Sequence, residues 1–517
     1  DIDIGIIFGY LALVLLIGGI VAFRTRSDED LFLGGRSLGW GLIGLSLFAS
    51  NISSTTLIGL SGAAYKTGIV QSVYEWSMGI PFILLALVFI PLYIKSRITT
   101  IPEFLEYRFD RRSRMIFSVI TIFISIVVDT AGGLYAGSRV LEVFFPDLII
   151  WQTSLMLAVF AGVYTAFGGL KAVVYTDAIQ AIILIVGCSI LTFLLFEQLD
   201  FSWDKMIAAA PEGHFSVVRP LDDDSLPWPG LILAVPFLGF WYMATNQYIT
   251  QRVLGAKNIQ HARWGVMLAG ALKMLPFFIM VIPGAMAISL IPGIEDIDMV
   301  FPVMVTEILP VGLLGLVLAG LISAILSSVD STLNSASTLV VVDFIKTRNP
   351  DISTKKMVQY GRLSTFVFML VAAAWSPMIA QFDGLWAYLQ EMFGIVVPPI
   401  VVIFLLGTFY KRGNGDGAFW TLVLGTAFGL TLFILGKLDL WPLHYTINVG
   451  LNVAFSSAIF VFVSLQTPAP DPEVVAKYTF RKELIDMENE NQPWYRDYKN
   501  QAAVLFVLVI STLIWLW

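Results

Sequence analysis

A cluster of oxygen-bearing side chains lies inside the long apolar stretch 311–342, which contains the sequence SAILSSVDSTLNSAST. On a helix, the i, i+3, i+4, i+7 spacing brings four polar residues onto one face: Ser327, Asp330, Ser331 and Asn334. Hydroxyl, carboxylate and amide oxygens suit a hard cation such as Na⁺. The face therefore predicts a cation or proton site at Asp330. The alternative is a polar seam between packed helices, in which the carboxylate needs a partner.

A second polar run, SNISSTT, interrupts the apolar stretch 40–65, and Ile52 is its single apolar residue. Such a run makes a poor continuous lipid-facing helix. It predicts an unwound point, where backbone carbonyls and hydroxyls replace the hydration water of an ion. Ser and Thr side chains that pack between close helices are the alternative.

Charged residues stand inside four further apolar stretches, and a charge within the membrane is a candidate functional group. Asp177 lies one turn into 172–197, where a helix-end charge near water is the alternative. Glu75 follows Tyr74 within 73–94, Asp129 lies in 115–143 and Lys273 in 265–292. A buried Glu75–Lys273 pair is the structural interpretation. The functional interpretation is that both bind hydroxyl groups of a polar solute, and composition alone does not choose.

The composition of the 517 residues excludes most other classes of protein. Hydrophobic residues make up 57% and charged residues 13%, half of the roughly 25% charged residues of soluble domains. A soluble enzyme, a nucleic-acid binder, a coiled coil and a disordered chain are thereby excluded, and the net charge of −7 gives no basic footprint. One cysteine and three histidines provide no disulfide framework or metal centre. Hydrolase and nucleotide-binding motifs are also missing, so we expect no enzyme.

The hydrophobic pattern predicts an all-α polytopic membrane protein with one transmembrane domain. A membrane helix needs about 20 apolar residues. About fourteen stretches qualify: 4–23, 40–65, 73–94, 115–143, 151–168, 172–197, 228–251, 265–292, 311–342, 363–382, 385–409, 415–436, 443–466 and 501–517. Most Lys and Arg residues fall in the odd-numbered loops, which predicts that both termini face outside. Segment 467–499 is then a cytoplasmic linker with a short helix.

Several motifs together resemble the sodium:solute symporter family, and within it the sodium/glucose and sodium/galactose cotransporters. They are LFLGGRSLGW, ANISSTTLIGLSGAAY, VYEW, TIPEFLEYRF, FGGLKAVVYTDAIQ, NQYITQRVLGAK, SSVDSTLNSAST and YLQE. The resemblance implies a LeuT-like fold with five-plus-five inverted repeats. It implies a leading helix and loop (1–30), a first repeat (39–197), a second repeat (228–410) and additional C-terminal helices (411–517).

The resemblance also implies sodium sites. The main site of the family falls on the carbonyls of Ala49, Ile52 and Ala324 and on the hydroxyls of Ser327 and Ser328. Members with a second sodium ion use positions that match three residues here: Asp177, Asp330 and Ser331. Two carboxylates at that second site lead to the hypothesis of two sodium ions per solute, with a proton on one aspartate as the alternative.

For the solute, the resemblance implies a sugar-binding pocket. Glu75, Lys273 and Gln390 match sugar-binding residues, Tyr242 matches the aromatic inner gate, and Tyr74 lies beside Glu75. Three further pocket positions depart from the galactose carrier: Thr56, Asp129 and Gly239. Sialic-acid carriers have an arginine at the position of Asp129, so a carboxylate there argues against an anionic solute.

The sequence therefore predicts a sodium-coupled symporter that imports a neutral sugar or polyol by alternating access. Its partners are Na⁺, the solute and the lipid bilayer, with no nucleic acid, and we expect a functional monomer in the plasma membrane, with a bacterial inner membrane favoured. Alternatives are a symporter of another small solute, such as myo-inositol or an amino acid, and a sugar-gated sensor that accumulates nothing.

Overall fold

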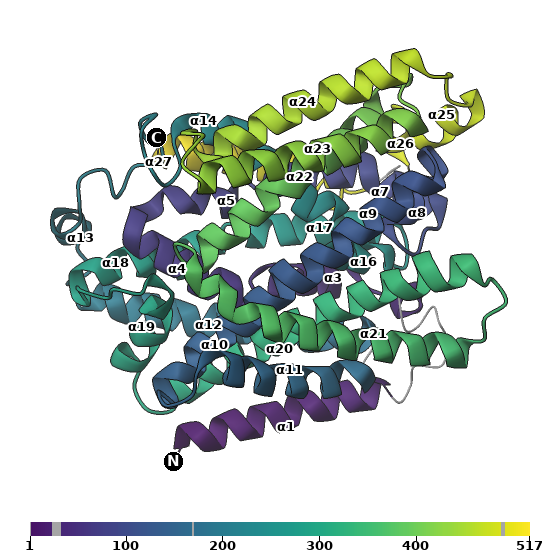
Figure 1. Ribbon diagram of the computed structural model, residues 1–517. Coiled ribbons are helices and arrows are strands. Elements are labelled where there is room, and N and C mark those ends of the chain that lie inside the picture. Colours follow the sequence, from purple (N-terminus) through teal and green to yellow (C-terminus); the bar gives the residue numbers. More distant parts are fainter. Residues whose placement is uncertain (1, 23–32, 168–169, 488–491, 517) are drawn as a thin grey trace.

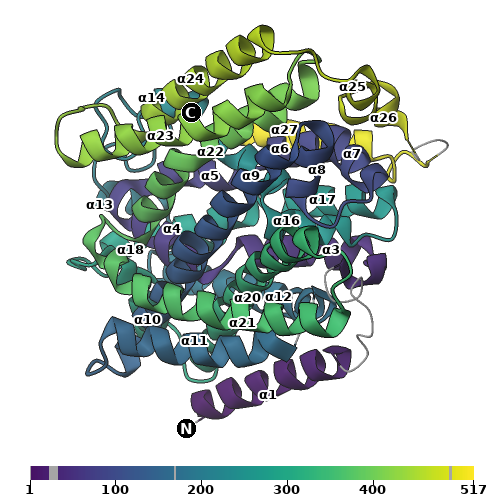
Figure 2. The same ribbon diagram turned by 45° about the vertical axis from the view of Figure 1, so that its right-hand side comes forward.

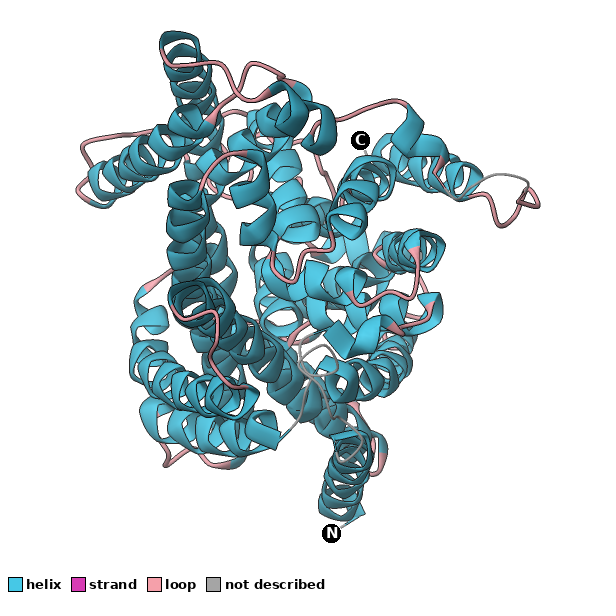
Figure 3. Cartoon of the chain, turned by 90° about the vertical axis from the view of Figure 1, so that its right-hand side faces the viewer, coloured by secondary structure: helices cyan, strands magenta, loops and turns pink. Residues whose placement is uncertain are grey.

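The computed structural model describes residues 2–22, 33–167, 170–487 and 492–516, and this part of the chain is predominantly helical (Figure 3). Within the described residues there is no β-strand, and only two isolated bridges join Leu38 to Ala256 and Arg219 to Pro227. The expectation of an all-α protein is thus confirmed.

The first half of the chain begins with α1 (Ile2–Ala22), and a break divides the next expected span into α3 (Trp40–Asn51) and α4 (Ser54–Thr67). The other elements of this half are η1 (Gly34–Arg36), which precedes α3, then η2 (Gly68–Ser72), α5 (Val73–Trp76), α6 (Gly79–Leu84), η3 (Leu85–Phe89), α7 (Ile90–Ser96), α8 (Ile101–Arg108), α9 (Arg111–Phe123), η4 (Ile124–Thr130), α10 (Ala131–Phe144), α11 (Ile150–Phe167) and α12 (Leu170–Glu197), with α13 (Trp203–Ala209) inside the 198–227 loop.

The second half also begins with an interrupted span. Its elements are α14 (Trp228–Leu233), α15 (Val235–Phe240), η5 (Trp241–Thr245), α16 (Gln247–Leu254), α17 (Ile259–Leu272), η6 (Phe277–Val281), α18 (Ile282–Leu290), η7 (Ile297–Met299), α19 (Val300–Ile308), α20 (Leu313–Leu339), η8 (Val340–Lys346), α21 (Thr354–Trp375), η9 (Ser376–Gln381), α22 (Leu385–Phe409), α23 (Gly415–Lys437), α24 (Tyr445–Gln466), α25 (Pro472–Tyr478), α26 (Glu483–Asp486) and α27 (Tyr498–Leu516).

Eleven helical segments of the described chain are long and apolar enough to cross a membrane. One of them, Ser54–Ser96, is 43 residues long and contains parts of two expected spans, and the apolar segment Ile150–Val159 is shorter than the others. The protein is therefore a multi-pass membrane protein, while the total of about fourteen spans stays a prediction. The expected short helix in the polar linker 467–499 is present as α25, and α26 adds a second.

The helices are arranged around a central group that contains both interrupted spans. Figures 1 and 2 place α1 at one edge of the molecule and α23 with α24 at the opposite edge. Between these edges, α3 packs against α12 and α17, and α20 packs against α12. Helix α1 covers α12 and α20, whereas α23 and α24 cover α22. The central helices therefore hold the candidate site away from the lipid.

Several spans contain a turn of π-helix, and two expected solute-binding residues lie in such turns. Asp129 is in η4, and Tyr242 is in η5. A π-helical turn holds one more residue than an α-helical turn and often marks a functional site. It changes the direction of the side chains it contains, which a regular helical spacing would not predict.

Candidate functional site

The first interruption lies where the polar run predicts it. Helix α3 ends at Asn51 and α4 begins at Ser54, while Ser53 between them is extended (φ −81°, ψ 173°). The last carbonyls of a helix have no intrahelical N–H partner, and they carry its negative dipole end. Ala49 and Ile52 stand at this end of α3, so the break offers backbone oxygens to a cation, as the sequence predicts.

The second interruption is not expected from the sequence, which predicts a continuous span over 228–251. The structure breaks this span at Asn246, whose ψ of 128° is extended. The Asn246 side chain accepts a hydrogen bond from the backbone N–H of Tyr248 (3.2 Å). This N-cap stabilises the start of α16 and satisfies a donor that the interruption exposes. Helix α16 is thus a separate short element that carries its own side chains.

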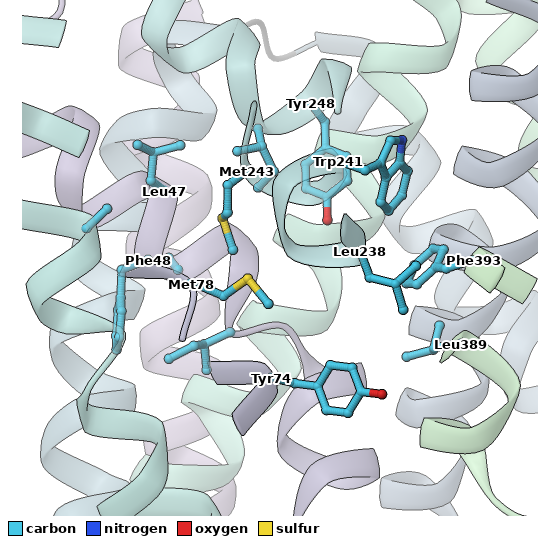
Figure 4. Packing of buried hydrophobic residues seen from close by; sticks show 14 of the residues in the cluster. Leu47, Phe48, Tyr74, Met78, Leu238, Trp241, Met243, Tyr248, Leu389 and Phe393 are labelled. Atoms are coloured by element: carbon cyan, nitrogen blue, oxygen red, sulfur yellow. The ribbon is translucent and has the colours of Figure 1, made fainter. Parts of the chain in front are cut away.

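A narrow cavity of about 60 Å³ lies between the two interrupted spans. Seven expected solute-binding residues line it: Thr56, Tyr74, Glu75, Asp129, Gly239, Tyr242 and Gln390. Two residues that the sequence does not mark as solute-binding also line this cavity, Asn51 and Trp386. Figure 4 shows Tyr74 on one side of this region and Trp241 with Tyr248 on the other, separated by apolar side chains of Met78, Leu238 and Phe393. A volume of this size corresponds to a few water molecules, so a solute as large as a hexose fits only when the lining moves.

Lys273 reaches the cavity through its partners. Its ammonium group contacts the Glu75 carboxylate and the Asn51 side-chain oxygen, and both of these residues line the cavity. The Lys273 and Glu75 side chains are 1% and 5% exposed. The expected ion pair is therefore present, and it also holds the last residue of α3. The solute pocket and the first interruption are connected through this single ammonium group.

Asp129 differs from the paired Glu75. Its Oδ2 atom is buried and has no hydrogen-bond partner among the residues that the structure describes. A buried polar atom without a partner costs free energy, so such atoms are rare unless a ligand or water completes them. The side of the cavity at Asp129 therefore presents an acceptor for a hydroxyl donor.

Two layers of aromatic residues close the cavity. On one side, the Tyr242 and Tyr248 hydroxyls are in contact, and the Trp241 ring lies 4.8 Å from the Phe393 ring. We call Tyr242 with Tyr248 the floor.

On the other side, Trp386 donates a hydrogen bond to Gln71 (3.0 Å), and the hydroxyls of Tyr74 and Tyr445 are 2.9 Å apart. We call these four residues the roof. Beyond the roof lies a wider cavity of about 750 Å³, which the 198–227 loop partly lines. Tyr445 comes from α24, so a helix outside the two expected repeats contributes to the roof.

The expected sodium-binding residues lie on neighbouring helices. Ala324, Ser327 and Ser328 are buried on α20, which packs against α3 and α4. The Ser328 hydroxyl is buried and has no hydrogen-bond partner within the described part of the chain, whereas the Ser327 hydroxyl donates to Asp177. A buried and unpartnered hydroxyl oxygen on a helix that packs against both sides of the break fits a cation site.

Two of the three residues expected at the second sodium site contact an arginine that the sequence does not mark as part of the site. Asp177 is completely buried and accepts a hydrogen bond from Arg252 (2.9 Å), which also donates to Ser331 (2.9 Å). Asp330 is buried on the same helix as Ser331. The expected span 228–251 ends just before Arg252 and leaves this residue in a loop, but it is 1% exposed within α16. Only the apolar residues Ile249, Val253 and Leu254 around it could have indicated burial.

The interrupted helices, the pocket between them and the oxygen-rich face of α20 define the protein as a membrane transporter with a LeuT-like fold. Its structure matches that of a Na⁺-coupled sialic acid symporter with a TM-score of 0.78 and 21% identity, over 91% of this chain and 99% of the other. Residues 31–425 match the model of the sodium:solute symporter family. The chain belongs to this family.

Curated relatives agree with this assignment. The chain is 34% identical to human (Homo sapiens) sodium/myo-inositol cotransporter 2 over 85% of its length and 71% of the relative. It is also 34% identical to rabbit (Oryctolagus cuniculus) sodium/glucose cotransporter 1, over 84% of its length and 72% of the relative.

Proposed function

We propose that the protein imports a neutral sugar or polyol together with sodium by alternating access. The observation that carries this proposal is the contact of Lys273 with both Glu75 and Asn51. Glu75 lines the solute pocket, and Asn51 ends the helix whose last carbonyls face the main sodium site. Solute and ion thus act on one connected network, which is the physical requirement for coupled transport.

The chemistry of the pocket favours a neutral polyhydroxylated solute. Glu75, Asp129 and Gln390 supply oxygen acceptors, and carboxylates accept strong hydrogen bonds from hydroxyl groups. An anionic solute would be repelled by the carboxylates in a low-dielectric cavity. Tyr242 and Trp386 supply aromatic surface for the apolar face of a ring. The names of the relatives, cotransporters of myo-inositol and of glucose, support this class of solute.

For sodium we propose a main site made by the Ala49, Ile52 and Ala324 carbonyls and the Ser327 and Ser328 hydroxyls. The exposed helix end at the break and the buried Ser328 hydroxyl support it. A second sodium site is formed by Asp177, Asp330 and Ser331. These ions are cargo, and each one that crosses the membrane gains about 2.3 kcal/mol per 100 mV, with about 1.4 kcal/mol more for a tenfold gradient.

In the proposed cycle, sodium from outside binds between α3 and α20 and orders the broken helix. Asn51 then holds Lys273 and Glu75 in the geometry that binds the solute. The roof closes over the solute, and the floor opens to release the solute and sodium inside. We place the wider cavity and both termini outside, in the plasma membrane of a cell, with a bacterial inner membrane favoured and the monomer as the functional unit. The repeats 39–197 and 228–410 each begin with an interrupted span, which supports their assignment.

Uptake into proteoliposomes tests this function. Labelled glucose, galactose and myo-inositol are offered with an inward Na⁺ gradient, or with K⁺ in place of Na⁺. We expect one of them to accumulate with Na⁺ only. Accumulation of none, under conditions in which an amino acid accumulates, would contradict the sugar or polyol assignment. Sodium-dependent current without any tracer accumulation would favour a sensor instead.

A further inference from the structure

Both oxygens of the Asp177 carboxylate are occupied in the structure. Oδ2 accepts hydrogen bonds from Ser46 (2.6 Å), Ser50 (3.2 Å) and Arg252 (2.9 Å), and Oδ1 accepts one from Ser327. A buried carboxylate requires such compensation, because an unpaired charge away from water is costly. Within the part of the chain that the structure describes, the positive charge that compensates Asp177 is the guanidinium of Arg252.

The guanidinium stands where a second sodium ion would bind. One of its nitrogens, Nη2, donates to both Asp177 and Ser331, and its Nε donates to Ser46 (2.7 Å). A cation between Asp177 and Ser331 needs the same oxygens. Two positive charges within a few ångströms of one another also repel in the buried site. The guanidinium and the ion therefore exclude each other.

Helix α16 links this pair to the floor of the solute pocket. Tyr248 and Arg252 are four residues apart and share one face of α16. The Tyr248 hydroxyl contacts Tyr242, and the Arg252 guanidinium contacts Asp177. Because α16 begins at the interruption at Asn246, it can shift without its preceding helix. The arginine thus anchors the element that supports the floor.

We propose that Arg252 is an internal cation that neutralises Asp177 in the sodium-free carrier and is displaced when sodium enters the second sodium site. This inference rests on the proposed function as a sodium-coupled symporter. The sodium-free carrier returns to its outward state with Asp177 paired to Arg252. The buried carboxylate therefore keeps a positive partner during this conformational change. Sodium entry frees α16 and prepares the floor beneath the solute for opening.

The first test is Arg252→Gln, assayed in proteoliposomes by net uptake and by solute exchange with Na⁺ and solute on both sides. Net uptake requires return of the empty carrier and exchange does not. We expect net uptake to slow about tenfold, exchange to be retained, and the half-saturating sodium concentration to fall about tenfold, because the competitor is gone. A purely structural role predicts that both rates fall together and that the sodium dependence is unchanged or weaker, and this result would overturn the inference.

Two further variants keep the test decisive. Ser46→Ala removes one acceptor of the guanidinium and one donor to Asp177, and no expected sodium ligand. Both changes make the Asp177 carboxylate easier for the ion to reach, so we expect half-saturating sodium to fall about threefold. An unchanged or higher value would count against the inference. Arg108→Gln is the matched control, because Arg108 is also buried and donates to the carbonyls of Gly407 (2.7 Å) and Tyr410 (3.4 Å), far in sequence from the Asp177 cluster. Its sodium dependence should equal that of the parent protein.

A solute-free measurement separates this inference from the proposed function. Sodium binding raises the unfolding temperature of the purified full-length protein as the ion concentration increases. We expect this rise at lower Na⁺ in Arg252→Gln than in the parent, with K⁺ without effect. If no sugar is transported but this difference is found, the substrate assignment fails and the inference stands. Equal sodium titrations of parent and variant would overturn the inference even if sugar uptake is sodium-dependent.

Discussion

The solute pocket and the Asp177 cluster are both buried and charged, but they differ in how completely their carboxylates are paired. Asp177 has hydrogen-bond donors on both oxygens, from Ser46, Ser50, Arg252 and Ser327. Asp129 in the pocket has a buried Oδ2 with no partner among the described residues. A satisfied network is rigid and resists change, whereas an unsatisfied acceptor is ready for a ligand.

This difference in pairing implies that the solute and the cation bind in different ways. A solute with hydroxyl groups completes the pocket without breaking an existing ion pair. A cation at the Asp177 cluster must first displace hydrogen bonds that the protein already makes. In the proposed mechanism, the pocket selects the solute, while the Asp177 cluster makes the conformation depend on the ion.

The largest effects are expected at the Glu75–Lys273 pair. Glu75→Gln or Lys273→Gln alone leaves one buried charge without its partner, which costs about 3–5 kcal/mol of stability, and sodium-dependent uptake should fall by at least about a hundredfold. The double variant removes both charges and should recover most of the stability but little of the uptake. Thermal unfolding and uptake, measured on all three variants, separate the structural role of the pair from its role in solute binding. Full recovery of uptake in the double variant would show that the pair is only structural.

Asp129→Asn tests whether the unpaired carboxylate in the pocket binds the solute. Replacement of an anionic acceptor that binds a hydroxyl group costs about 1.5–3 kcal/mol, so we expect the half-saturating solute concentration to rise between about tenfold and a hundredfold. The half-saturating sodium concentration should stay the same, since no hydrogen bond or ion pair among the described residues joins Asp129 to the Asp177 cluster. A change confined to the sodium dependence would place Asp129 in the ion site instead.

Ser328→Ala tests the main sodium site, as Asp129→Asn tests the solute pocket. Loss of one ion ligand should raise the half-saturating sodium concentration about tenfold, while the solute affinity at saturating sodium is retained. Sodium titrations of uptake at fixed solute, and solute titrations at high sodium, measure the two quantities separately. An unchanged sodium titration would remove Ser328 from the site.

The sequence predicted the parts of this site that depend on local polarity. The run SNISSTT predicted the first break, because so many polar groups cannot face lipid in a regular helix. A charged residue inside an apolar stretch is a candidate functional group. This argument alone indicated Asp177, Glu75 and Lys273. The pairing of Glu75 with Lys273 was also anticipated, although its contact with Asn51 was not.

Other parts could not be predicted because they depend on contacts between distant segments. The break at Asn246 lies in a span whose apolar residues read as one helix, and a single capping side chain decides it. Arg252 directly follows an expected span, where a basic residue usually lies in a loop. Its contact with Asp177 forms only in the folded protein, because the two residues are far apart in the sequence. Trp386 and Tyr445 come from spans with no polar run, so nothing local marks them as parts of the roof.

The smallest effect is expected at His214, beside the wider cavity and outside both compared regions. Burial, and to a smaller extent repulsion from Arg219, lowers the pKa of His214 to about 4. Between pH 6.5 and about 4 the unfolded chain therefore binds a proton that the folded chain does not, so this contribution to stability is lost as the pH falls through that window and is constant above it. His214→Gln should reduce the loss of unfolding temperature between about pH 8 and about pH 5 without changing sodium or solute dependence. An equal loss in parent and variant would contradict the buried neutral state of His214.

The most direct test of coupling between the pocket and the ion sites is equilibrium binding of the transported sugar or polyol to the purified protein in Na⁺ and in K⁺. We expect the solute to bind at least about tenfold more tightly in Na⁺, and sodium to bind more tightly by the same factor when the solute is present, because a coupling free energy is reciprocal. Solute binding of equal strength in Na⁺ and K⁺ would contradict the connection through Asn51, Lys273 and Glu75.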